Sequence, residues 1–121
     1  MPDTDAVVDG YIEMWNETDP GRRHELVART VTEDARYLDP LMAGEGIDGI
    51  GSMIAGAQQQ FPEHRFTLIA GPDRHHDRVR FSWALSANRG EPVAVGVDFA
   101  TLAEDGRMRS ITGFLEQETA A

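Results

Sequence analysis

Cysteine and lysine are both missing from the 121 residues of this chain, and no apolar run approaches the length of a membrane span. Disulfides, thiolate nucleophiles and cysteine-bound metals are therefore excluded, and so is Schiff-base chemistry on lysine. All eleven basic residues are arginine, and the 21 acidic residues leave a formal net charge of -10, which repels nucleic acid and anionic membranes. With no signal-peptide pattern at its start, the chain is expected to be a soluble cytoplasmic protein with no nucleic-acid or membrane partner.

The length suits one domain, residues 1–121, with helices in the first half and strands in the second. Apolar residues at helical spacing predict a first helix capped by Thr4. Pro20, preceded by Thr18 or Asp19, predicts the start of a second helix. Residues 32–35 are expected to close this helical hairpin.

The remaining elements are separated by turn residues. Residues 36–39 predict a short strand that Pro40 ends, and a glycine-rich loop then leads to a third helix over residues 47–60. From His64 onward the apolar residues alternate, which predicts four strands in an antiparallel meander. The turns between them are expected at residues 71–73, 88–90 and 104–106.

The second of these four strands shows which face is apolar. Val79, Phe81, Trp83 and Leu85 share one face, and Arg80, Ser82, Ala84 and Ser86 share the other. We therefore expect an α+β fold in which three helices pack on one face of a strongly curved antiparallel sheet. The mouth of such a cone is a natural site for a small molecule.

Several segments carry a resemblance to a known family. They are Tyr11–Asp19 (YIEMWNETD), Tyr37–Pro40 (YLDP), Asp98-Phe99, Asp105–Arg107 (DGR) and Gly113-Phe114. Together they resemble the SnoaL-like branch of the nuclear transport factor two-like superfamily, which includes ketosteroid isomerases and polyketide cyclases. The match runs from Thr4 to about Gln117, and it implies the cone fold and a homodimer formed through the sheet.

The same resemblance implies roles for three candidate catalytic residues. Tyr11, Asp39 and Asp98 match, in order, three functional positions of the ketosteroid isomerases. By that analogy Asp39 removes a proton α to a carbonyl, and Tyr11 and a neutral Asp98 stabilise the enolate oxygen. The residues themselves agree for Asp98, because an acid within an apolar strand is expected to have a buried partner or a function, and burial favours its protonated form.

Other interpretations stay open. A tyrosine on the apolar stripe of a helix, such as Tyr11, is commonly a core residue, and an aspartate before proline, such as Asp39, is equally typical of a strand end and a turn. Asp98 faces solvent if the strand register is shifted by one. The alternative function is therefore a non-catalytic ligand-binding or dimerisation module of the same fold.

The expected ligand is a small apolar or aromatic carbonyl compound. The candidate substrate-binding residues are Trp15, Phe81, Trp83, Phe114 and Leu115. If both tryptophans face inward, they leave less room than a flat four-ring ligand needs. Isomerisation and cyclisation use the same acid–base chemistry, and the sequence does not separate them.

No cofactor and no metal are expected. Residues 44–49 spell GxGxxG, but this motif needs a βαβ unit, so we interpret it as a flexible loop. The four histidines lack the spacing of metal ligands. The resemblance also offers epoxide hydrolases of the same superfamily, which use an arginine between carboxylates on the sheet. Arg80 lies near the matching place, but Ser82 and Gly113 stand where the acids are expected, so this reaction is disfavoured.

Overall fold

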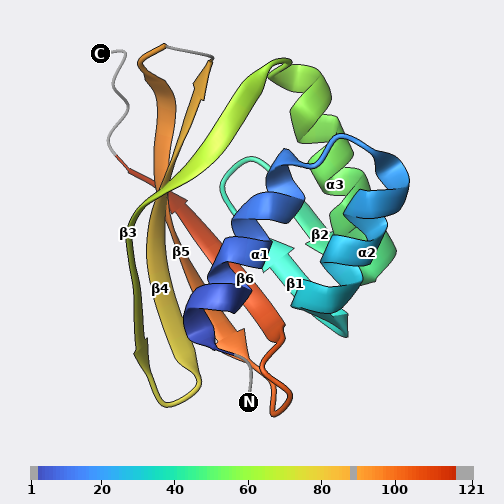
Figure 1. Ribbon diagram of the computed structural model, residues 1–121, viewed down its shortest axis with the longest axis vertical. Coiled ribbons are helices and arrows are strands. Elements are labelled where there is room, and N and C mark those ends of the chain that lie inside the picture. Colours follow the sequence, from blue (N-terminus) through green and yellow to red (C-terminus); the bar gives the residue numbers. More distant parts are fainter. Residues whose placement is uncertain (1–2, 88–89, 117–121) are drawn as a thin grey trace.

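A computed structural model of the chain describes residues 3–87 and 90–116. Within these ranges it contains three helices and one six-stranded sheet, and the helices lie together on one side of the sheet (Figure 1). This arrangement confirms the α+β fold predicted from the sequence. No helix in the described part of the chain is long and apolar enough to cross a membrane.

Helix α1 spans Thr4–Asn16 and buries one face against the sheet, through Val8, Tyr11, Met14 and Trp15. Thr4 is the first helical residue, so the predicted cap at Thr4 is wrong. The Thr4 hydroxyl instead accepts a hydrogen bond of 2.8 Å from Arg74.

Helix α2 spans Pro20–Thr30 and begins as expected. The Asp19 carboxylate accepts a hydrogen bond of 2.9 Å from the Arg22 backbone N–H, and Pro20 occupies the first turn, where its missing N–H costs nothing.

Strand β1, Val31–Leu38, follows α2 without an intervening turn. The prediction that residues 32–35 close a helical hairpin is therefore wrong. Glu33 and Asp34 are both exposed, and the pairing of β1 with its neighbour shifts register between Val31 and Arg36. A bulge of this kind places consecutive polar residues in a strand without burying them.

The glycine-rich segment is ordered and splits between two elements. Ala43–Glu45 forms strand β2, antiparallel to β1, and Gly46–Gln60 forms helix α3. The interpretation of this segment as a flexible loop is wrong, because its backbone pairs with β1. The GxGxxG sequence, residues 44–49, therefore begins inside β2 of an antiparallel hairpin and continues into α3, and it is not part of a βαβ unit.

The predicted meander is present as β3 (His64–His75), β4 (Arg78–Ala87), β5 (Pro92–Leu102) and β6 (Met108–Leu115). The sheet order is β2-β1-β6-β5-β4-β3. All neighbours are antiparallel except β1 and β6, which run parallel and make the sheet mixed.

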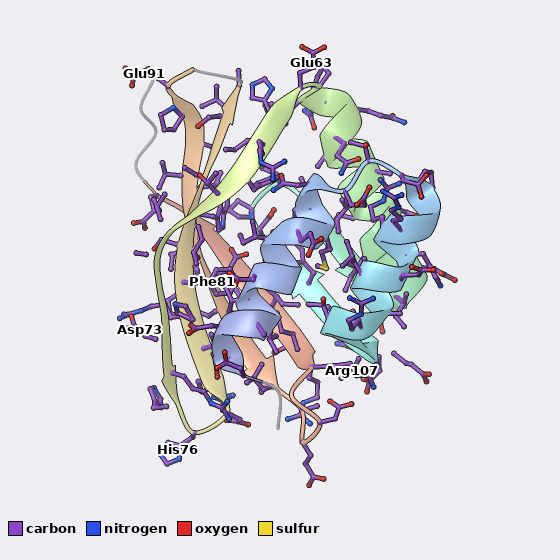
Figure 2. The ribbon with its side chains drawn as sticks, viewed as in Figure 1. Glu63, Asp73, His76, Phe81, Glu91 and Arg107 are labelled. Atoms are coloured by element: carbon purple, nitrogen blue, oxygen red, sulfur yellow. The ribbon has the colours of Figure 1, made fainter. Side chains whose placement is uncertain are left out.

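One predicted turn is wrong. Residues 71–73 lie inside β3, where the pairing with β4 shifts register, and the chain reverses only after His75. Proline 72 is tolerated there because β3 is an edge strand and needs no ladder hydrogen bond on its outer side. His76, at the tip of the β3–β4 hairpin, points away from the molecule (Figure 2). The predicted turn at 104–106 is present, whereas residues 88 and 89 of the turn predicted at 88–90 lie outside the described ranges.

Candidate active site

A cavity of about 90 Å³ lies between the helices and the inner face of the sheet. Most of its wall is apolar, with contributions from α1, α3 and the strands β1, β3, β4, β5 and β6. The polar side chains in the wall are Tyr11, Tyr37, Asp39, Trp83 and Asp98. All three candidate catalytic residues therefore reach one cavity.

Asp98 lies in the middle of β5 and points inward. Burial alternates along this strand, so Asp98 is only 2 % exposed while Phe99 faces outward. The Tyr11 hydroxyl donates to Asp98 Oδ2 over 2.8 Å, and the Trp83 indole N–H donates to Asp98 Oδ1 over 3.0 Å. Each carboxyl oxygen thus has a neutral donor.

Burial dominates the electrostatics of this carboxyl. It raises the pKa of Asp98 from 3.8 to about 6, and the nearby charge of Asp39 acts in the same direction, although the hydrogen bonds from Trp83 and Tyr11 oppose the shift. Burial and the charge of Asp98 raise the pKa of Tyr11 well above 10. The Tyr11 hydroxyl therefore keeps its proton at any physiological pH.

Asp39 is half-buried at the end of β1, and its two oxygens have different partners. Oδ1 accepts hydrogen bonds from the backbone N–H groups of Leu41 at 2.7 Å and Met42 at 2.8 Å. Oδ2 accepts a 2.5 Å hydrogen bond from the Tyr37 hydroxyl. Asp39 thus organises a turn and also lines the cavity, so both of its sequence interpretations have a structural basis.

Gly113 makes the meeting of these side chains possible. It lies opposite Asp98 in the β5–β6 ladder. A Cβ atom at Gly113 would stand 2.8 Å from Asp98 Oδ1, 3.2 Å from Asp39 Cβ and 3.4 Å from the Tyr37 hydroxyl. The two carboxyl side chains therefore converge over a position that has no side chain.

Several members of the site were not among the candidates from the sequence, and two of them are Tyr37 and Gly96. Tyr37 holds Asp39, and the signal was available, because residues two apart in a strand point to the same face. Gly96 is the second: it pairs with Trp83 across the sheet, and a Cβ there would overlap the indole ring. Sequence alone gave no sign that this glycine makes room for Trp83.

The candidate substrate-binding residues divide into two groups. Trp15, Trp83 and Leu115 line the cavity. Phe81 lies beneath it in the core on the inner side of β4, with its ring 5.2 Å from that of Tyr11 (Figure 2). Phe114 is 53 % exposed on the opposite face of the sheet. The structure thus places Phe81 and Phe114 outside the cavity wall, Phe114 because alternation along β6 turns it outward.

Both tryptophans face inward, which accounts for the small volume. Trp15 lies near the end of α1, and its backbone carbonyl accepts a 3.0 Å hydrogen bond from the Gln58 side chain of α3. On the other side, Asn16 exchanges two hydrogen bonds of 2.8 and 2.9 Å with the Phe66 backbone. Polar side chains outside the cavity therefore fix two of its aromatic walls.

The structure offers little for a metal or for epoxide opening. Among residues 3–87 and 90–116, no group of three or more His, Cys, Asp or Glu side chains could hold a metal ion. Arg80 is exposed on the other face of the sheet and pairs with Asp73 at 2.8 Å. It cannot act in the cavity.

The chain is similar to known structures over most of its length. It shares 44 % identity with a SnoaL-like family protein of Agrobacterium tumefaciens provisionally described as an isomerase, covering 93 % of this chain and 96 % of that one with a TM-score of 0.88. A SnoaL-like protein of Jannaschia provisionally described as a polyketide cyclase is 18 % identical over 91 % of this chain and 85 % of that one, with a TM-score of 0.70.

A third structure, from Catenulispora acidiphila, has a ketosteroid isomerase-like fold and was solved with trimethylamine. The two sequences are 14 % identical, the match covers 94 % of this chain and 86 % of that chain, and the TM-score is 0.73. The two matches below 25 % identity show the fold alone. A comparison with curated proteins finds no match. The model of the SnoaL-like domain matches residues 8–111, and the chain therefore belongs to the SnoaL-like family.

Proposed function

We propose that this protein binds a small apolar or aromatic carbonyl compound and moves a proton at the carbon next to the carbonyl, as an isomerase or a cyclase does. The observation that carries the proposal is the meeting of two carboxyls in different environments, Asp39 and Asp98, in one apolar cavity. Pairs of this kind divide acid and base roles between them.

Asp39 is the better placed group to take the proton from carbon. It is half-exposed on the cavity wall, and within residues 3–87 and 90–116 its Oδ2 receives one hydrogen bond, which leaves a lone pair free. The backbone N–H groups of Leu41 and Met42 hold the other oxygen and so fix the direction of the carboxylate. A positioned carboxylate of this kind can act as a general base.

Asp98 is the better placed group to stabilise the enolate oxygen. Burial raises its pKa to about 6, so at mildly acidic pH it holds a proton that it can donate in a hydrogen bond to the enolate oxygen. Tyr11 directs its single proton at Asp98, so Tyr11 acts through Asp98 and is a positioning residue. This changes the role that the resemblance implied for Tyr11, which was direct contact with the enolate.

The comparisons support the reaction class. The 44 % identical protein is provisionally described as an isomerase. Isomerisation and cyclisation both pass through an enolate, and the proposed roles of Asp39 and Asp98 serve either one.

Phenols and naphthols of graded acidity imitate an enolate and provide the test. Trp15 and Trp83 line the cavity, so binding is expected to change the intrinsic fluorescence. We expect affinity to follow phenol acidity in the wild type and to fall at least about tenfold in Asp98→Leu, which loses a charge-assisted hydrogen bond. Absence of binding to the folded wild type would overturn the proposed site.

A non-catalytic binding module is the second candidate. It is favoured by one observation: two backbone N–H groups and a tyrosine hydroxyl already engage Asp39, which is what a purely structural turn needs. Exchange of α-hydrogens of small aromatic ketones in D₂O separates the two candidates. Proton transfer predicts exchange that Asp39→Asn abolishes, whereas a binding module predicts phenol binding without exchange.

We also propose that the uncovered face of the sheet pairs with a second copy. Phe99 and Phe114 are exposed there, with ring centroids 5.8 Å apart, and Leu38 is exposed on the same sheet. Exposed aromatic side chains in contact with one another are typical of an interface. Sedimentation equilibrium should give twice the monomer mass, and Phe114→Glu should give the monomer mass.

A further inference from the structure

We propose that the ligand of this cavity carries a positively charged nitrogen, which lies against the aromatic walls and pairs with a carboxylate of Asp39 or Asp98. This inference rests on the proposed function for placing the ligand in the cavity. It adds a positively charged nitrogen to the small carbonyl compound proposed above.

The first argument is an imbalance of charge. Asp39 and Asp98 share the cavity, and within residues 3–87 and 90–116 neither has an arginine or histidine nitrogen within 4.0 Å. Their hydrogen-bond donors are hydroxyl, indole and amide groups, which carry no charge. Even when one of the two carboxyls holds a proton, the other leaves a negative charge in an apolar wall, where charges are normally paired.

The second argument is the nature of the wall itself. Six aromatic side chains line the cavity: Tyr11, Trp15, Tyr37, Phe61, Phe66 and Trp83. Four of these rings form a connected series, with centroids 5.6 Å apart for Trp15 and Tyr37, 5.2 Å for Trp15 and Phe66, and 5.3 Å for Phe66 and Trp83.

Rings packed in this way present π-faces and edges to a ligand between them. An organic cation gains attraction from the negative face of an aromatic ring, and it gains more where water is excluded. A neutral ligand of the same shape gains the apolar contacts but leaves the charge of the cavity unpaired.

A matched pair of probes tests this argument. Choline and 3,3-dimethylbutan-1-ol have the same shape, and they differ in that a quaternary nitrogen replaces a quaternary carbon. Tryptophan fluorescence at pH 7.5 and fixed ionic strength measures both. We expect choline to bind at least about tenfold more tightly, as one ion pair and contacts with rings predict.

Three variants locate the source of the preference. Asp39→Asn and Asp98→Asn should each reduce the choline-to-alcohol affinity ratio several-fold. Asp5→Asn removes the same charge from an exposed position in the first turn of α1 and should leave the ratio unchanged. Equal affinity for the two probes in the wild type, or a ratio that the cavity variants do not change, would overturn the inference.

The wild type at low pH provides a second readout if Asp98→Asn does not fold. Between pH 7.5 and 5 Asp98 gains its proton, because its pKa is about 6, so the ratio should fall. The other titratable groups that face it are Asp39, Tyr11 and Tyr37, and burial raises the pKa of both tyrosines out of this range. A ratio that stays constant at pH 5 contradicts a contribution from Asp98.

The outcomes for the two proposals are separable. If phenols bind but choline and the alcohol bind equally, the proposal of a positively charged ligand is wrong and the proposed carbonyl site is retained. If choline is strongly preferred but no α-hydrogens exchange, the positively charged ligand is supported and the proposed proton transfer is wrong.

Discussion

Gly113 lies directly opposite Asp98 in the β5–β6 ladder, and a Cβ at Gly113 would stand 2.8 Å from Asp98 Oδ1. Real Cβ atoms do not come so close to an oxygen, so a side chain at this position would displace the carboxyl. A residue with no side chain is therefore a structural requirement of the site.

Gly113→Ala tests this relationship. We expect the added methyl group to push Asp98 away from Tyr11 and to lower the free energy of unfolding by about 1–3 kcal/mol, the usual cost of overpacking. Phenol binding should be lost with it. Gly56→Ala is the matched control, because a Cβ there meets nothing within 4 Å and helix α3 should gain about 1 kcal/mol. Urea unfolding of both variants gives the comparison, and a stable, phenol-binding Gly113→Ala would contradict it.

Ionisation of Asp98 should make the wild type less stable. Its pKa is about 6 in the folded state against 3.8 unfolded, so the folded state binds the proton more tightly. The stability from this group is complete below pH 4 and is lost as the pH rises through 6, by about 3 kcal/mol at most.

Asp98→Asn removes this titration and provides the reference. The difference in unfolding free energy between wild type and Asp98→Asn should shift in favour of the variant between pH 4 and 7, while contributions from other carboxyls cancel. Urea unfolding at each pH measures it. A difference that does not change with pH would show that Asp98 does not titrate in this range.

Tyr11→Phe should raise the pKa of Asp98 further. The Tyr11 hydroxyl donates to Asp98 Oδ2 and stabilises the charged form, so its removal favours the proton. Tyr37→Phe is the control, because it also removes a tyrosine hydroxyl, but one that donates to Asp39 instead of Asp98. The carbon NMR signal of the Asp98 carboxyl, followed against pH, reports both variants. An unchanged midpoint in Tyr11→Phe would mean that the hydrogen bond has no energetic role.

Asp39 should show separable structural and chemical roles. Asp39→Asn keeps an oxygen for the Leu41 and Met42 backbone N–H groups, so we expect a nearly unchanged melting temperature together with lost α-hydrogen exchange. Asp39→Ala leaves both N–H groups without this acceptor and should cost about 1–2 kcal/mol. Thermal unfolding of both variants measures the difference. If Asp39→Asn and Asp39→Ala destabilise the protein equally, the charge of the carboxylate itself has a structural role.

Much of the fold was predictable because it depends on local patterns. Helical spacing placed α1 correctly, the turn residues around 47–60 placed α3, and Pro20 with Asp19 placed the start of α2. Alternation placed the four long strands and showed which face of β4 is buried. These features arise from short-range geometry, which the order of residues carries directly.

The errors share a different cause. Residues 32–35 and 71–73 have the composition of turns, but each lies in a strand at an irregular register, where pairing with a neighbour overrides local preference. The parallel pairing of β1 with β6 joins segments from the two ends of the chain, and no local pattern reports it.

The sequence by itself determined that this protein would be an acidic α+β domain without thiol or lysine chemistry, and it named Tyr11, Asp39 and Asp98 as candidates while leaving the direction of Asp98 open. Only the tertiary structure decided how they meet. The Tyr11–Asp98 hydrogen bond spans 87 positions, and it requires the curvature of the sheet, the indole of Trp83 and the empty position at Gly113 at once. Distances between side chains on different elements depend on packing of the whole domain, so they follow from the fold and not from any one segment.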